Sequence, residues 1–163
     1  MTTPFPSDGM TLTHLLVVSD LARSTAWYRD VLGAELVGEY GGTSAVFRFV
    51  DSWLLAVTGG GPTDDKPTVS FEPPPDPNRV TGELIIGVPD CHAAYDALTA
   101  RGARFLTPPV EYAWEIRAFF RDPDGHLFEI SERRRGDRPR DERPRDDQRG
   151  EPPPGEPPPG EGR

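Results

Sequence analysis

The sequence predicts an α+β fold in which two βαβββ modules form curved mixed sheets around a cleft, with a charged tail after them. Three observations predict it: the same order of elements appears twice, short motifs recur about seventy positions apart, and the composition changes abruptly after Glu132. The 163 residues suffice for one domain with an ordinary core and are too few for two large independent domains.

The first module is expected over residues 12–58, after an N-terminal arm of residues 1–11. Residues 12–18 form an apolar run that is too short for a helix and rich in β-branched residues, which predicts a mostly buried strand. Asp20 is a good N-cap, and apolar residues recur after it with a helical period until Gly33, which predicts an amphipathic helix. Short β-prone runs separated by turn residues predict three more strands, at residues 35–40, 44–50 and 53–58.

A Pro- and Gly-rich segment, residues 59–79, separates the two modules. It is long for a connection inside a compact domain, so a linker or a lid over a binding site is expected. The second module, residues 80–132, repeats the order of the first, with Asp90 capping its helix and Gly102 ending it. Its strands are expected at residues 80–88, 104–106, 113–121 and 126–131.

The turn at residues 122–125 leads into the last strand and into its least expected side chain. Pro123 presets φ for the turn and Gly125 accepts the positive φ that closes it, so a hairpin is predicted. In the strand that follows, Glu129 and Ser131 share the face opposite the apolar one. Glu129 is either a glutamate on a solvent-facing edge or a group that binds a ligand.

The two modules can be aligned with each other. Val18-Ser19-Asp20 matches Val88-Pro89-Asp90, seventy positions later, which indicates an internal duplication. The same alignment matches Glu129 with Ala56, or with Leu55 if the register slips by one residue. Neither counterpart can bind a metal, so the duplicated cleft is expected to be chemically unequal, with the chemistry in the second module.

Composition and charge exclude several classes of partner. Residues 133–163 contain no aliphatic or aromatic side chain, which predicts a disordered tail. Residues 1–132 carry nine Lys and Arg against nineteen Asp and Glu, which argues against nucleic acid and anionic membranes as partners. Cys91 is the only cysteine and no stretch approaches the roughly 18 apolar residues of a membrane span, so a cytoplasmic location is expected.

The motifs resemble those of the vicinal oxygen chelate superfamily, the group of glyoxalase I, extradiol dioxygenases, fosfomycin-resistance enzymes and bleomycin-resistance proteins. The resemblance covers about residues 12–132, and this fold hosts very different functions. It rests on residues 17–24, 27–33, 88–90 and 122–130.

The resemblance implies one divalent metal between the sheets, with His, Gln or Glu ligands from the first and last strand of each module. It thereby suggests Glu83, Glu129 and His14 as ligands of Zn, Ni, Mn or Fe, with positions left open for water or substrate. Thr13 holds the matching position of the first module and is a poor ligand. His14, one step on, would point to the opposite face unless the strand carries a bulge. Glu83 could instead be a glutamate in solvent at the start of a strand, and the chain could lack a metal altogether.

Aromatic and charged side chains near these glutamates suit a small planar or oxygen-rich ligand. The same aromatic residues could instead be core or dimer contacts. The residues expected in the cleft are Thr13, Arg48, Trp53, Trp114 and Arg117.

These observations favour a glyoxalase-like enzyme, a metal-assisted lyase, isomerase or related enzyme that acts on a small oxygen-rich metabolite. Glu129 and Glu83 are the expected catalytic residues, and either could be a general base, since burial in an apolar cleft raises the pKa of a carboxylate. The alternative is a metal-free protein that binds a small antibiotic or toxin, as bleomycin-resistance proteins do. A homodimer is expected. The sequence leaves open whether the two modules pair within one chain or with the modules of the other chain in the dimer.

Overall fold

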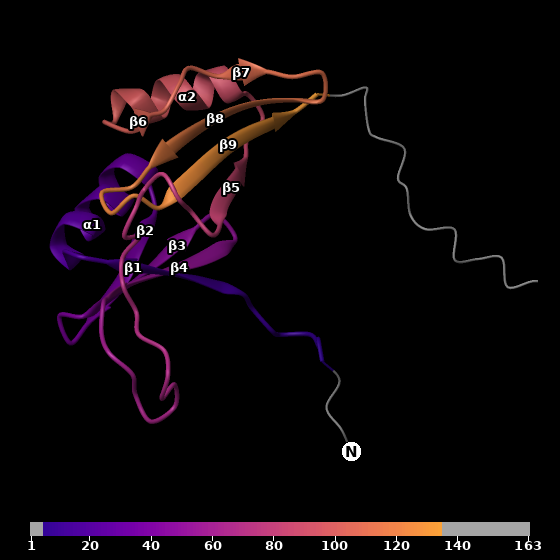
Figure 1. Ribbon diagram of the computed structural model, residues 1–163. Helices are drawn as coiled ribbons and strands as arrows, with labels where there is room; N and C mark the ends of the chain where they lie inside the picture. The colour runs from indigo at the N-terminus through magenta and orange to yellow at the C-terminus, as the bar shows by residue number, and fades with distance from the viewer. Residues whose placement is uncertain (1–4, 135–163) are drawn as a thin grey trace, which may run out of the picture.

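The computed structural model describes residues 5–134, and they form the two predicted modules, each with one mixed sheet and one main helix (Figure 1). The α+β fold class is therefore confirmed. The predicted disordered tail lies outside the described residues from residue 135 onward. The last strand extends to Arg133, one residue into the segment that was expected to be tail. Among the described residues, no helix is long and apolar enough to span a membrane.

The first module follows the predicted order. Its elements are β1 (Thr13–Val18), α1 (Leu21–Trp27), the π-helical turn η1 (Tyr28–Leu32), β2 (Glu35–Tyr40), β3 (Ser44–Phe49) and β4 (Ser52–Thr58). The side chain of Asp20 accepts a hydrogen bond from the Arg23 backbone N–H at 2.9 Å, and Gly33 ends the helix with a φ of 81°. The strand order is β1-β4-β3-β2, with β1 and β4 parallel and the other pairs antiparallel.

The second module repeats this order with one additional short strand. Its elements are β5 (Glu83–Gly87), α2 (Cys91–Ala100), β6 (Arg104–Phe105), β7 (Val110–Glu111), β8 (Glu115–Arg121) and β9 (Leu127–Arg133). The order is β5-β9-β8-β6, and β7 also pairs with β8. The strand predicted from residue 113 begins only at Glu115, because the Tyr112 N–H bonds the Glu115 carbonyl at 2.8 Å and closes a turn there. The strand predicted at residues 80–88 is shorter, since β5 pairs with β9 only over Glu83–Gly87.

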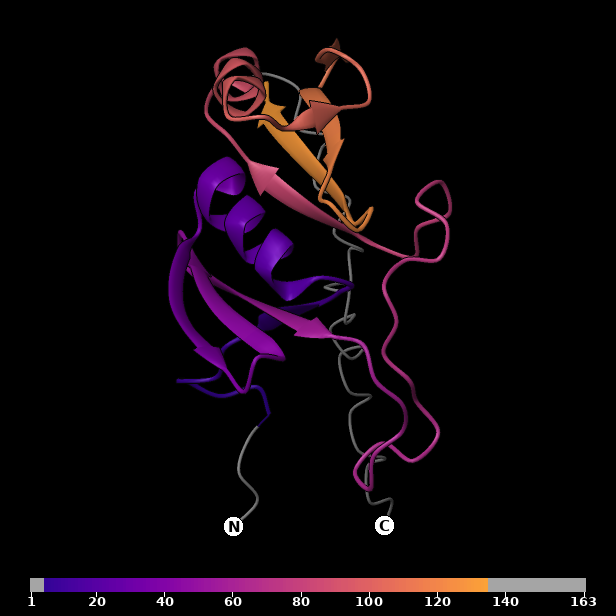
Figure 2. The same ribbon diagram turned by 90° about the vertical axis from the view of Figure 1, so that its left-hand side faces the viewer.

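The Pro- and Gly-rich connection between β4 and β5 projects from the body of the molecule (Figure 2). Gly60 and Phe71 exchange backbone hydrogen bonds of 2.9 and 2.8 Å across it, and the Lys66 ammonium bonds the Gly61 carbonyl at 2.8 Å. Its far end contacts the second module, where Arg121 donates to the Asn78 side chain at 2.9 Å.

Both sheets bury one face in a single core, and helix α1 lies between them (Figure 2). Trp27 on this helix contacts Phe120 and Phe128 of the second sheet, with ring centroids 6.2 and 5.8 Å away. The first sheet contributes Leu16, Val18, Ala45, Phe47, Leu54 and Ala56, and the second contributes Ile116, Ala118, Phe120, Phe128 and Ile130. The opposite face of each sheet therefore points outward, and we call it the open face. The open face of the second sheet carries Glu83, Ile85, Arg117, Phe119, Glu129 and Ser131.

Candidate functional site

A pocket of about 800 Å³ lies on the open face of the second sheet. It is formed where β5 and β9 run parallel, beside the start of β8. Its polar walls are mostly acidic. The residues that matter for its chemistry are Ile85, Glu115, Glu129, Ser131, Glu132 and Arg133.

Glu129 lies at the centre of this face. It pairs with Ile85 of β5 on one side and with Phe119 of β8 on the other, so it belongs to an interior strand and is only 4% exposed. Burial raises the pKa of Glu129, and the carboxylates of Glu83 and Glu115 raise it further, while Arg117 acts in the opposite direction. Within the part of the chain that the structure describes, its carboxylate forms no ion pair. The explanation of Glu129 as a solvent-facing edge residue therefore does not hold.

A guanidinium is fixed on the same face beside Glu129. Arg117 Nη1 lies 3.0 Å from Glu115 Oε1, and the Ser131 hydroxyl donates to Glu115 Oε2 at 3.1 Å. The guanidinium stacks over the Tyr112 ring at 4.7 Å and lies 5.5 Å from the Phe119 ring centroid. Its Nε atom is buried and lacks a hydrogen-bond partner among the described residues.

Glu83, the second predicted catalytic residue, begins β5 and shares the open face with Glu129. It is exposed, and its charge acts on the pKa of Glu129, so the structure brings these two carboxylates into one neighbourhood.

The strand registers correct the alignment of the two modules. Leu15 pairs with Leu55 as Ile85 pairs with Glu129, so Leu55 is the counterpart of Glu129. Ala56 points into the core. The motif alignment is one residue off because the turn before β4 is shorter than the turn before β9. The inference that the first module lacks a ligand at this position is unchanged.

His14 lies on the other side of its strand. It pairs with Leu54 in an uninterrupted β1–β4 register, so no bulge turns it toward the open face. It lines a separate pocket of about 490 Å³ between the modules, which also reaches Glu83. Burial lowers the pKa of His14, and the nearby His126 lowers it further. The structure thus brings His14 near Glu83 and leaves it apart from Glu129.

A metal site requires several ligand atoms around one point. Among the described residues, no group of three His, Cys, Asp or Glu side chains could hold a metal ion. Of the carboxylates near Glu129, Glu115 is already bound to Arg117 and Ser131. The pair Glu83 and Glu129 leaves most coordination positions of a divalent ion unfilled, so the side chains of residues 5–134 do not by themselves fit a resident metal.

The remaining predicted cleft residues divide between the modules. Thr13 and Trp53 are paired on the open face of the first sheet, and Arg48 on the same face forms an ion pair with Glu35. None of the five predicted cleft residues lines the pocket at Glu129, and Trp53 lines the pocket at His14 instead. Trp114 lies in the second module, 56% exposed, and stacks on Tyr112 with centroids 6.1 Å apart.

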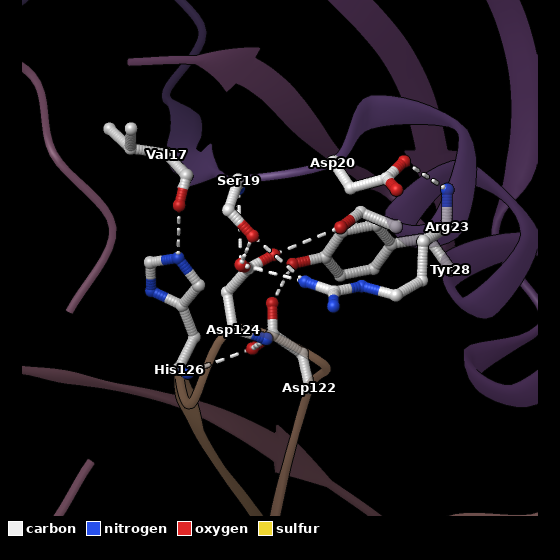
Figure 3. A network of polar contacts seen from close by, with 9 residues as sticks. Val17, Ser19, Asp20, Arg23, Tyr28, Asp122, Asp124 and His126 are labelled. Carbon is white, nitrogen blue, oxygen red and sulfur yellow. Dashed lines mark hydrogen bonds and ion pairs between the residues drawn. The ribbon is translucent and has the colours of Figure 1, made fainter. Parts of the chain in front are cut away.

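A polar network that the sequence did not predict joins the β8–β9 turn to the first module (Figure 3). Asp124 accepts hydrogen bonds from the Ser19 N–H at 3.0 Å, the Ser19 hydroxyl at 2.5 Å and the Ser24 hydroxyl at 3.0 Å. The buried hydroxyl of Tyr28 donates to Asp122 at 2.5 Å. These side chains belong to the stretches that resemble the family, but their contacts could not be predicted, because no periodic pattern reports a contact about a hundred positions away.

The same turn places His126 against the first strand. His126 Nε2 lies 2.8 Å from the Val17 carbonyl oxygen (Figure 3). A carbonyl only accepts, so Nε2 carries the proton of this contact. The β8–β9 hairpin, which carries Arg117 and Glu129, is therefore fixed to the first module at its turn.

Comparison with known proteins gives a consistent family. Residues 11–130 match the Glyoxalase/Bleomycin resistance protein/Dioxygenase superfamily. A probable lactoylglutathione lyase from Vibrio parahaemolyticus is 29% identical over 140 residues, which cover 79% of this chain and 94% of that protein. The lactoylglutathione lyase from Haemophilus influenzae is 30% identical over 129 residues, covering 77% of this chain and 94% of that protein.

Solved structures have the same architecture. A glyoxalase/bleomycin resistance protein/dioxygenase from Nocardioides has a TM-score of 0.60 and 26% identity, covering 82% of this chain and 89% of its own. Two structures at lower identity are similar in fold alone. A fosfomycin resistance protein from Listeria monocytogenes, in complex with Mn(II), has a TM-score of 0.54 and 19% identity, covering 76% of this chain and 89% of its own. An antibiotic binding protein from Streptomyces has a TM-score of 0.56 and 20% identity, covering 77% of this chain and 97% of its own.

Proposed function

Because the chain belongs to the Glyoxalase/Bleomycin resistance protein/Dioxygenase superfamily, we propose that it is an enzyme that transfers a proton on a small oxygen-rich molecule. The reaction takes place in the pocket on the open face of the second sheet, with Glu129 as the catalytic acid and base. The observation that carries this proposal is a carboxylate that is 4% exposed, lies in a pocket and has a pKa raised by burial and by two neighbouring acids. A carboxylate whose pKa is raised in this way is suited to accept a proton from a ligand and return it.

Glu83, the other predicted catalytic residue, acts in this proposal through its charge, since it shares the face of Glu129 but does not line the pocket there. Its negative charge favours the protonated form of Glu129, so proton uptake by Glu129 relieves repulsion between the two groups. Removing this charge should lower the pKa of Glu129 and make it a weaker base.

A metal-assisted form of the reaction is the version that the family resemblance suggested, with Zn, Ni, Mn or Fe on Glu83, Glu129 and His14. It would require ligands beyond those that residues 5–134 bring together. Metal analysis of protein purified without chelator tests it. A content near one ion per chain, lost in the Glu83→Gln and Glu129→Gln variants, would support a metal at this position.

The proposal includes a homodimer and a cytoplasmic location. Large apolar side chains remain exposed on the open faces, including Leu15 on the first sheet and Ile85 on the second, at 37% and 62%. A second copy that covers these faces would remove them from water and narrow the pocket at Glu129. Light scattering coupled to size-exclusion chromatography measures whether the mass in solution is that of two chains.

A second candidate function is metal-free binding of a small antibiotic or toxin. The counterparts of Glu83 and Glu129 in the first module are Thr13 and Leu55, which provide no catalytic group. The exposed stack of Trp114 on Tyr112 offers a surface for a flat ligand. A calorimetric titration with tight stoichiometric binding and no turnover would favour this candidate.

The test of proton transfer is deuterium incorporation from D₂O. Small hydroxy ketones and hydroxy aldehydes are incubated with the full chain, and loss of the proton next to the carbonyl is followed by NMR. The proposal expects exchange that Glu129→Gln removes and that Glu72→Gln, an exposed site in the connection between modules, leaves unchanged. Equal rates for the wild type and Glu129→Gln would exclude Glu129 as the proton-transfer group.

A further inference from the structure

We propose that Arg117 binds the carbonyl oxygen of the ligand while Glu129 takes the ligand's proton. Arg117 lies on the same face as Glu129, next to the pocket rather than in its lining. This inference rests on the proposed function and names the group that the ligand presents, an oxygen that becomes negatively charged. Arg117 was expected in the cleft from the sequence, but without a role.

The strand register places Arg117 and Glu129 on one face. Arg117 pairs with Ser131 across the β8–β9 ladder, so it is the diagonal neighbour of Glu129. Diagonal side chains of an antiparallel pair begin about 7–8 Å apart, a gap that one small molecule can bridge. The charges of the two groups act on each other, as the effect of Arg117 on the pKa of Glu129 shows.

The guanidinium is held in place before any ligand arrives. It is stacked over Tyr112 at 4.7 Å and lies near Phe119 at 5.5 Å, and its Nη1 contacts Glu115 at 3.0 Å. Glu115 is itself held by the Ser131 hydroxyl. A donor fixed in this way does not have to reorganise when charge develops on the ligand.

Arg117 also has donor capacity that the described residues do not use. A guanidinium has five N–H groups, and the contact with Glu115 occupies Nη1. Nε is buried and has no partner among the described residues, which is uncommon for a buried donor. The Arg117 side chain is 36% exposed, so a ligand can reach its guanidinium, and a carbonyl or carboxylate oxygen fits the fork of an arginine.

The chemical step needs no further reactant. The Glu129 carboxylate removes a proton from the carbon next to the carbonyl, and the electron pair of that C–H bond forms a C=C bond. The π electrons of the carbonyl move to its oxygen, which becomes an enolate oxygen held by the N–H groups of Arg117. Exchange of the Glu129 proton with solvent, followed by protonation of the same carbon, completes a hydrogen exchange. An isomerisation also requires the neighbouring hydroxyl to pass its proton to the enolate oxygen, after which Glu129 protonates the former carbonyl carbon and the hydroxyl oxygen becomes the new carbonyl.

The experiment uses the full chain and acetohydroxamate as the probe, a planar molecule with two adjacent oxygens. Calorimetry compares the wild type with Arg117→Gln, Arg117→Lys and Arg29→Gln. Arg29 is an exposed arginine that pairs with Asp30, so its variant is the matched control. We expect Arg117→Gln to weaken binding at least about tenfold, through loss of charged hydrogen bonds. Arg117→Lys should restore only part of the affinity, and Arg29→Gln should bind as the wild type does.

A second measurement avoids substitution at this position. The Arg117 Nε–H signal of the unmodified chain, followed by NMR, should shift as acetohydroxamate is added. An unshifted signal, absence of binding to the wild type, or affinity within twofold of the wild type in Arg117→Gln would each overturn the role of Arg117.

The two proposals can fail separately. If Arg117 binds the probe but no deuterium exchange depends on Glu129, the proposed proton transfer is wrong and the oxygen-binding role of Arg117 remains. If exchange depends on Glu129 and the Arg117 variants bind the probe normally, the proposed function remains and this inference is wrong.

Discussion

Asp124 provides the sharpest test of how the second module is held against the first. Its side chain is 3% exposed and accepts three hydrogen bonds from Ser19 and Ser24. Each such bond contributes about 1 kcal/mol, or somewhat more when the acceptor is charged. The ion pair with Arg23 adds little, because that guanidinium is half exposed. We therefore expect Asp124→Ala to lower the free energy of unfolding by about 3–5 kcal/mol.

Urea unfolding at pH 7, followed by tryptophan fluorescence, measures this loss. Trp27 packs against the core and reports its opening. Asp96→Ala is the matched control, since Asp96 is an exposed aspartate on α2, and a surface substitution of this kind should stay within about 0.5 kcal/mol. A loss below about 1 kcal/mol in Asp124→Ala would refute the reasoning, because three bonds to a buried carboxylate cannot be worth so little.

The contribution of Asp124 should also depend on pH. Burial acts to raise the pKa of Asp124, but the hydrogen bonds from Ser19 and Ser24 and the charge of Arg23 outweigh it, so the pKa lies below its usual 3.8. A carboxylate with a lowered folded-state pKa stabilises the fold above the unfolded value, and this stabilisation is lost as pH falls through the folded value. The difference between wild type and Asp124→Ala should therefore be constant from about pH 5 to pH 7 and shrink below about pH 4.

Three further predictions concern the same hairpin. Tyr28→Phe should lower the free energy of unfolding by about 1–3 kcal/mol, because the buried Asp122 loses a donor; an unchanged urea midpoint would contradict it. Gly125→Ala should destabilise by about 1–3 kcal/mol, since Gly125 has a φ of 92° and a Cβ there would lie 2.9 Å from Pro77 Cβ; a melting temperature equal to that of the wild type would argue against strain. Glu129→Gln should be more stable than the wild type at pH 8 and equal to it at pH 4. Because the pKa of Glu129 is raised in the folded state, the wild type loses stability as pH rises from the unfolded to the folded pKa. Thermal unfolding at both pH values measures this, and a Glu129→Gln variant that is no more stable than the wild type at pH 8 would contradict it.

The duplicated fold could be predicted because its signals are local. Asp20 and Asp90 cap the two helices as expected, and Gly33 and Gly102 have the positive φ that was expected after each helix. The regular helix predicted up to Gly33 ends instead in the π-helical turn η1, in which the Gly33 N–H bonds the Tyr28 carbonyl. The spacing of apolar residues predicts a helix, but it does not indicate whether the backbone N–H groups bond the carbonyl four or five residues earlier. The π-helical turn could therefore not be predicted.

The role of Glu129 in a site stays a prediction, but its position in the sheet could be predicted. The sequence identified Glu129, and its expected face was correct because side chains alternate along a strand. Matching motifs gave Ala56 as its counterpart, whereas strand pairing gives Leu55, because the lengths of the two turns differ and a motif alignment does not measure pairing. The cluster of Arg117, Glu115 and Tyr112 could not be predicted, since it depends on the short strand β7 and on the turn that precedes β8.

The two ends of the β8–β9 hairpin differ in how their polar groups are satisfied. At the turn, the buried carboxylate of Asp124 has its acceptor positions filled by the first module. On the open face, Glu129 is buried beside other acids and Arg117 keeps a buried N–H without a partner among the described residues. A buried carboxylate beside other acids and a buried N–H without a partner both cost stability, so they persist only where the surrounding structure prevents a rearrangement or a ligand offsets the cost. The hydrogen bonds to Asp124 fix the position of the hairpin. In this position Arg117 and Glu129 do not form an ion pair with each other, and both remain free to bind a ligand.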